Sequence, residues 1–139
     1  MKPSIGMGLL VLRVGIGMMF MLFGWPKITG GPEKWTQLGG AMAVLGVVFA
    51  PVFWGFMAAV AEFVGGLALL LGVLVRPFAA MMAFTMAVAA VMLVKNDSEF
   101  LQYSHAIDML IVFVALLIAG GGNYTLGSQI APLAGKWYE

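Results

Sequence analysis

Four long apolar runs leave this chain almost no alternative to a membrane fold. They cover residues 5–25, 51–75, 77–94 and 103–119. Each run is close to the ~20 residues that a helix needs to cross about 30 Å of hydrocarbon. Because a chain in lipid must satisfy its backbone polar groups internally, each run predicts a transmembrane helix. We therefore expect an all-α integral membrane protein, a four-transmembrane-helix bundle that forms a single domain over residues 1–139.

Composition agrees with this class and excludes several others. Of the 139 residues, 63% are hydrophobic and 9% are charged, whereas a soluble domain carries about 25% charged residues. The net charge of +1 says little about partners, but the lack of a basic tract gives no indication of a nucleic-acid partner. The sequence contains no cysteine and one histidine, so we expect no metal, haem or iron–sulfur cluster on this chain.

The connections between the runs predict how the helices follow one another. The second and third runs meet at Arg76-Pro77, which predicts an antiparallel hairpin because proline cannot continue the preceding helix. The first connection, 26–50, is longer, and its apolar-leaning part, 35–49, is too short to span. We expect an interfacial or re-entrant helix there. Four spans place both termini on the same side of the membrane, but three basic residues on each side do not decide which side.

Two ionisable residues lie deep inside the runs, Arg13 in the first and Glu62 in the second. A charge in hydrocarbon costs about 2.5–3.5 kcal/mol or more, so intramembrane charges are commonly paired and functional. Counting about 1.5 Å per residue puts Arg13 about 12 Å and Glu62 about 14 Å from the same membrane surface. We therefore expect these side chains to form an ion pair. That pair could serve function or act as a clasp that fixes helix register.

Further polar residues predict a ladder that leads from the loop side to this pair. His105 and Asp108 are three residues apart in the fourth run, so they share a helix face. We expect Lys27 and His105 at the mouth, Asp108 below them, and Arg13 with Glu62 at the bottom. Asp108 is acidic and shallow enough to meet water, which makes it a candidate for proton exchange.

The small residues indicate which helix faces pack together, because they let helices approach without intervening lipid. One stripe of the first run contains Arg13, Gly17, Phe20, Gly24 and Lys27. The equivalent stripe of the second run contains Gly55, Ala58, Glu62, Gly66, Leu69 and Val73, and Gly65 flanks it. In the third run Ala79, Ala83, Ala87 and Ala90 form a small edge, as do Asp108, Val112, Ala115 and Ala119 in the fourth. We expect the charged faces to point inward, and the edge of the third run makes a homo-oligomer plausible.

The same residues carry a resemblance. The pattern Arg13-x3-Gly17-x2-Phe20-x3-Gly24-x2-Lys27, followed by Ala61-Glu62-x2-Gly65-Gly66-x2-Leu69-x2-Gly72, resembles the signature of the DoxX family. The resemblance implies a small four-helix inner-membrane protein. It also implies that some relatives of this chain belong to thiosulfate:quinone oxidoreductases or to membrane-bound oxidoreductase complexes for redox stress. Because this chain has no cysteine, sulfur chemistry would have to reside on a partner.

Three functions remain open at this point. The first is an accessory or quinone-interacting subunit of a membrane oxidoreductase, at most a subunit of an enzyme, whose electrons come from a redox partner protein. The second is a small proton-coupled carrier or channel, and the third is a non-catalytic membrane anchor or assembly factor. For the first, Glu62 and Asp108 are the candidates for proton exchange. The candidate ligand-binding residues are Arg13, Gly17, Phe20, Lys27, Gly65, Gly66 and His105.

Overall fold

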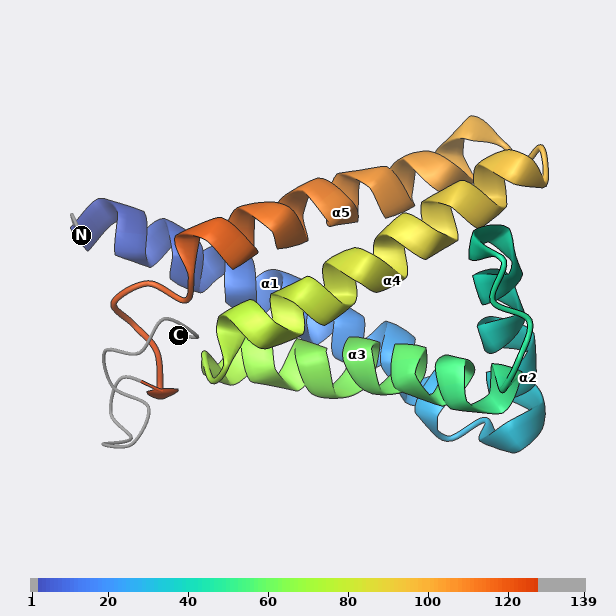
Figure 1. Cartoon of the computed structure of the whole chain (residues 1–139). Coiled ribbons are helices and arrows are strands. Elements are labelled where there is room, and N and C mark those ends of the chain that lie inside the picture. Colours follow the sequence, from blue (N-terminus) through green and yellow to red (C-terminus); the bar gives the residue numbers. More distant parts are fainter. Residues whose placement is uncertain (1–2, 128–139) are drawn as a thin grey trace.

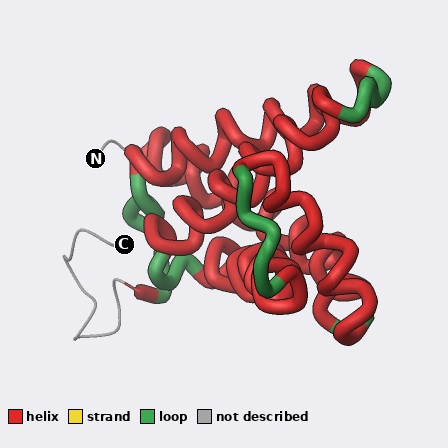
Figure 2. Tube along the Cα trace, turned by 45° about the vertical axis from the view of Figure 1, so that its right-hand side comes forward, coloured by secondary structure: helices red, strands yellow, loops and turns green. Residues whose placement is uncertain are grey.

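The computed structural model describes residues 3–127, and every regular element in that range is a helix (Figure 1). The elements are α1 (Pro3–Ile28), α2 (Gly31–Gly39), the 3₁₀ helix η1 (Gly40–Leu45), α3 (Pro51–Leu71), α4 (Val75–Lys95) and α5 (Phe100–Ala119). Within this range α1, α3, α4 and α5 are long and apolar enough to cross a membrane. The predicted all-α bundle of four spanning helices is confirmed, with short loops between the helices (Figure 2).

Helices α1 and α3 pack through glycine. A Cβ atom on Gly17 would lie 2.6 Å from the carbonyl oxygen of Gly66, and one on Gly24 would lie 2.5 Å from the backbone nitrogen of Phe63. Atoms at those separations overlap, so a side chain at either position would push the helices apart. The glycines therefore fix both the distance between the two helices and their register.

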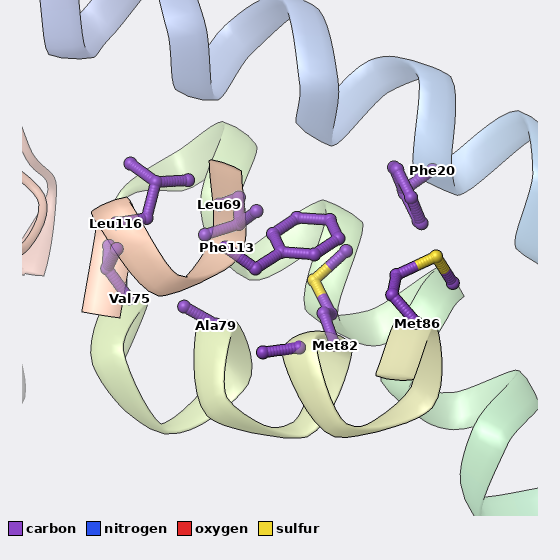
Figure 3. Close-up of a cluster of buried hydrophobic side chains, with 9 residues drawn as sticks. Phe20, Leu69, Val75, Ala79, Met82, Met86, Phe113 and Leu116 are labelled. Carbon is purple, nitrogen blue, oxygen red and sulfur yellow. The ribbon is translucent and has the colours of Figure 1, made fainter. Parts of the chain in front are cut away.

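The hydrophobic core lies where the four spanning helices meet, and Figure 3 shows its side chains converging from α1, α3, α4 and α5. The buried members are Phe20, Leu69, Val75, Ala79, Met82, Ala83, Met86, Phe113 and Leu116. The rings of Phe20 and Phe113 meet edge to face, with centroids 4.9 Å apart. Ala79 and Ala83 belong to the small edge of α4, so this part of the edge packs inside the bundle and is not free for a second copy.

The hairpin between α3 and α4 turns earlier than the predicted Arg76-Pro77. Helix α3 ends at Leu71, and the turn passes through Gly72, whose φ of 70° is left-handed, and Leu74 with φ 50°. Arg76 and Pro77 lie in the first turn of α4. Proline is tolerated there because the first amides of a helix have no intrahelical acceptor. The proline pattern thus marked a helix start, which sequence reasoning placed two residues too late.

The connection between α1 and α3 contains a short helix as expected, but α2 and its continuation η1 cover 31–45 and not the predicted 35–49. It lies across the spanning helices, between the start of α3 and the end of α4, and α3 and α4 diverge toward it (Figure 1). A Cβ atom on Gly39 would overlap the carbonyl of Pro51, and one on Gly55 would overlap the carbonyl of Trp35. Helix α2 is therefore seated directly on the backbone of α3.

Candidate functional site

Arg13 and Glu62 do not form the predicted ion pair. Arg13 is fully buried, and it donates through Nη1 to the carbonyl oxygen of Leu69 at 2.8 Å and through Nη2 to that of Tyr124 at 2.5 Å. The last carbonyls of a helix lack intrahelical donors and carry partial negative charge. Arg13 therefore caps the C-terminal end of α3 and holds the segment after α5 against it.

The prediction was wrong because it placed the ends of both helices at the same membrane level. Gly24, near the end of α1, contacts Phe63, in the middle of α3. Helix α1 is thus displaced along α3, and the first turns of α3 pack against α2 instead. This offset moves Arg13 to the level of the last turn of α3, and it brings the end of α1 to Glu62.

Glu62 pairs instead with Lys27. Nζ of Lys27 lies 2.7 Å from Oε1 and 2.5 Å from Oε2 of Glu62. The Glu62 side chain is 4% exposed and that of Lys27 is 28% exposed. The long lysine side chain lets a residue in the last turn of α1 reach the buried carboxylate of a residue on α3. The main-chain oxygen of Lys27 also accepts a hydrogen bond from Nε1 of Trp35, so α2 is attached at the same point.

This pair lies at the edge of a cavity of about 440 Å³. The cavity occupies the space between the diverging helices α3 and α4, and α2 with η1 forms its remaining wall. Its lining is mostly aliphatic, methionine and aromatic; the polar contributions come from Lys27, Glu62, Gln37, Thr85 and the indole of Trp54. An apolar pocket with a few polar groups is the usual form of a small-molecule site, for which volumes run from about 300 to 1,000 Å³.

Trp54 adds a feature that sequence reasoning missed. Its indole Nε1 is buried and has no hydrogen-bond partner among the described residues. Buried indole N–H groups normally find an acceptor, and an unpaired one is costly. A tryptophan within an apolar run is more often a membrane-interface residue, so the sequence offered only a weak signal for a donor in a pocket wall.

Asp108 and His105 lie outside this cavity, and the predicted polar ladder is not formed. Both side chains are exposed on α5, and the His105 ring lies edge to face with Phe23, with centroids 6.2 Å apart. The buried face of α5 carries Ala106 and Phe113. At about 100° per residue, Asp108 is about 200° away from Ala106, on the opposite side of the helix.

The small residues of α5 also face outward, contrary to expectation. Ala115 and Ala119 are exposed, whereas Phe113 and Leu116 are buried. Large apolar side chains bury more surface than alanine, so they decide which face of α5 turns to the core. The inward orientation predicted for the charged face holds for Arg13 and Glu62 and is wrong for Asp108.

The remaining predicted ligand-binding residues are packing residues in this structure. Gly17 and Gly66 form the α1–α3 contact, and Phe20 belongs to the core. Gly65 faces Met82, whose sulfur would lie 2.9 Å from an added Cβ. Of all the candidate residues, only Glu62 and Lys27 line the cavity. Within the described part of the chain, no three His, Cys, Asp or Glu side chains are grouped so that they could hold a metal ion.

Comparison with known proteins gives two kinds of match. The sequence model described as DoxX matches residues 8–95. "Inner membrane protein YqjF" of Escherichia coli (strain K12) is 31% identical over 131 residues, which cover 91% of this chain and 94% of that protein. "Putative oxidoreductase CatD" of Bacillus subtilis (strain 168) is 26% identical over 136 residues, covering 98% of this chain and 95% of that protein. No solved structure shows significant similarity.

Proposed function

This chain belongs to the DoxX family, and on that basis we propose that it is an accessory, quinone-binding subunit of an oxidoreductase system in the inner membrane. The quinone ring would occupy the cavity between α2, α3 and α4. The name of the Bacillus subtilis relative supports the redox assignment, and that of the Escherichia coli relative supports the inner membrane.

The observation that carries the proposal is the Lys27–Glu62 pair at the edge of an otherwise apolar cavity. A quinone headgroup is a flat apolar ring with carbonyl acceptors at its rim, so it needs apolar walls and a few donors. Lys27 Nζ and the unpartnered Nε1 of Trp54 are donors in the cavity wall. The cavity also lies among spanning helices, where a lipid-soluble ligand is concentrated.

In this proposal the side chains orient the ring and handle protons. A bound quinone would supply the electron chemistry, which the side chains of this chain lack. The ammonium of Lys27 donates to both carboxylate oxygens of Glu62 and so compensates the charge of this buried side chain. Glu62 holds or gives up a proton at Oε1 or Oε2, and the partly exposed Lys27 connects that carboxylate to water.

Electrons must come from elsewhere. The chain has no cysteine and a single histidine, so it offers neither a thiol pair nor the ligand set of a haem or cluster. We therefore include a separate redox protein in the proposal, bound at the membrane surface near α2, because that helix forms the wall between the cavity and the loop side.

The test is quinone retention. The protein is purified into lipid nanodiscs from its own membranes, extracted with organic solvent, and assayed for quinone by its redox difference spectrum. We expect near-stoichiometric quinone in the parent protein and at least a tenfold loss in Glu62→Gln. Glu99→Gln is the matched control, since Glu99 is exposed and lies outside the cavity.

Two results would overturn the proposal. One is a parent protein that retains no quinone even when ubiquinone or menaquinone is added to the nanodiscs. The other is a folded Glu62→Gln variant, monodisperse on gel filtration, that retains as much quinone as Glu99→Gln.

A further inference from the structure

Helix α5 presents a carboxylate on a face that the rest of the described chain leaves uncovered. Asp108 lies in the first half of this spanning helix and is exposed, as are Ile111 and Ile118 on the same side. The helix turns its other side, with Ala106 and Phe113, to the core. A carboxylate facing lipid is unfavourable, so such residues normally face a partner.

The same face carries a donor for that carboxylate. His105 lies one helical turn before Asp108, and the spacing of three residues puts both on one stripe. Its side chain is exposed although one edge of the ring also meets Phe23 of α1. The stripe continues toward the end of α5 through Ala115 and Ala119, both exposed. Small residues at such spacing let a second helix approach closely. One face thus combines a hydrogen-bond donor, an acceptor and a surface shaped for a helix.

We propose that this stripe is the interface of a homodimer, in which two α5 helices cross about a two-fold axis along the membrane normal. His105 of each copy donates a hydrogen bond to Asp108 of the other.

The symmetry supports a second copy rather than a different protein. An isologous interface must be self-complementary, and a stripe that carries both donor and acceptor meets this condition. Equal residues lie at equal depth around such an axis, and His105 and Asp108 are only about 4.5 Å apart along the helix. Both reciprocal bonds can therefore form at once. The small edge of α4, the alternative surface for a second copy, is buried at Ala79 and Ala83.

The lack of cysteine makes the first test specific, because every thiol is one that is introduced. Ala115→Cys is placed on the stripe, and Met18→Cys, at a position 53% exposed on α1, is the control. After oxidation in native membranes, we expect a cross-linked dimer for Ala115→Cys at least tenfold more abundant than for Met18→Cys. Equal yields from the two variants would overturn the proposal.

The second test exchanges the paired residues in the Ala115→Cys background. His105→Asp places the new carboxylate of one copy opposite Asp108 of the other. Because like charges repel, the cross-linking yield should fall at least tenfold. The double variant His105→Asp/Asp108→His restores donor and acceptor in reversed order, and it should restore the yield. An unchanged yield in His105→Asp, or a double variant that cross-links no better than His105→Asp, would contradict the His105–Asp108 pairing.

Discussion

Lys27 Nζ contacts both carboxylate oxygens of Glu62, at 2.7 and 2.5 Å, across the contact between α1 and α3. Because Glu62 is only 4% exposed, the ammonium is the group that compensates its charge. The pair therefore fixes the end of α1 to the middle of α3 and sets the polar edge of the cavity.

Lys27→Met should destabilise the protein strongly. It leaves a buried carboxylate without its cation, for which about 3–5 kcal/mol is typical, and the partial exposure of Lys27 favours about 3 kcal/mol. Unfolding by increasing SDS in mixed micelles measures the loss. The double variant Lys27→Met/Glu62→Leu removes the charge as well and should recover most of the stability. A double variant whose loss equals the sum of the single losses would show that the two residues are not coupled.

Gly17→Ala should separate α1 from α3. The new methyl would meet the carbonyl of Gly66 at 2.6 Å and the backbone nitrogen of Leu70 at 2.8 Å, neither of which can move alone. We expect a loss of about 2 kcal/mol in the free energy of unfolding. Gly15→Ala is the matched control, since nothing lies within 4 Å of its Cβ and alanine favours the helix by up to about 1 kcal/mol. Similar effects from the two changes would be incompatible with the packing described.

Arg13→Leu should release the segment after α5. The amides of Leu126 and Gly127 bond to the carbonyls of Leu71 and Gly72, and Arg13 holds this arrangement through Tyr124. We expect hydrogen exchange at those two amides to rise at least tenfold, which corresponds to about 1.4 kcal/mol. Arg76→Leu is the control because Arg76 donates to the carbonyl of Ile118 in α5 through an exposed hydrogen bond, away from those two amides. Protection that survives in Arg13→Leu would argue against the capping role.

Trp54→Phe tests the unpartnered donor. Phenylalanine keeps an aromatic ring in the cavity wall but removes Nε1, so a ligand loses one hydrogen bond, about 1 kcal/mol, and binds roughly five- to tenfold more weakly. Titration of quinone into nanodiscs measures the change. Trp25→Phe, at a position 57% exposed and outside the cavity, should leave the affinity unchanged. If both variants bind alike, Trp54 does not contact the ligand.

Length and hydropathy were enough to predict the four spanning helices and the short helix before α3, because lipid tolerates few alternatives. They could not predict which charges meet. The partner of Glu62 depends on the offset between α1 and α3, and that offset is set by contacts such as Gly24 with Phe63. The glycine stripe was correctly identified as a packing surface, but a stripe defines a face and leaves the register open.

Asp108 illustrates a second limit. Two rules competed for the orientation of α5: intramembrane charges turn inward, and large apolar side chains are buried. In this helix Phe113 and Leu116 are buried in the core, and Asp108 lies exposed on the outer face. Within one copy the first rule fails. In a dimer through α5 both rules would be satisfied, because Asp108 would then be covered by the second copy.

The two polar sites also lie at different ends of the bundle with apolar packing between them. Phe20 and Leu69, on the facing sides of α1 and α3, are 2% and 0% exposed and separate Arg13 from Glu62. A proton that leaves Glu62 therefore meets, among residues 3–127, no polar relay leading past these side chains. Protons exchanged in the cavity would be drawn from and returned to the same aqueous phase, the one beside α2. A site of this kind can support redox turnover without carrying protons across the membrane.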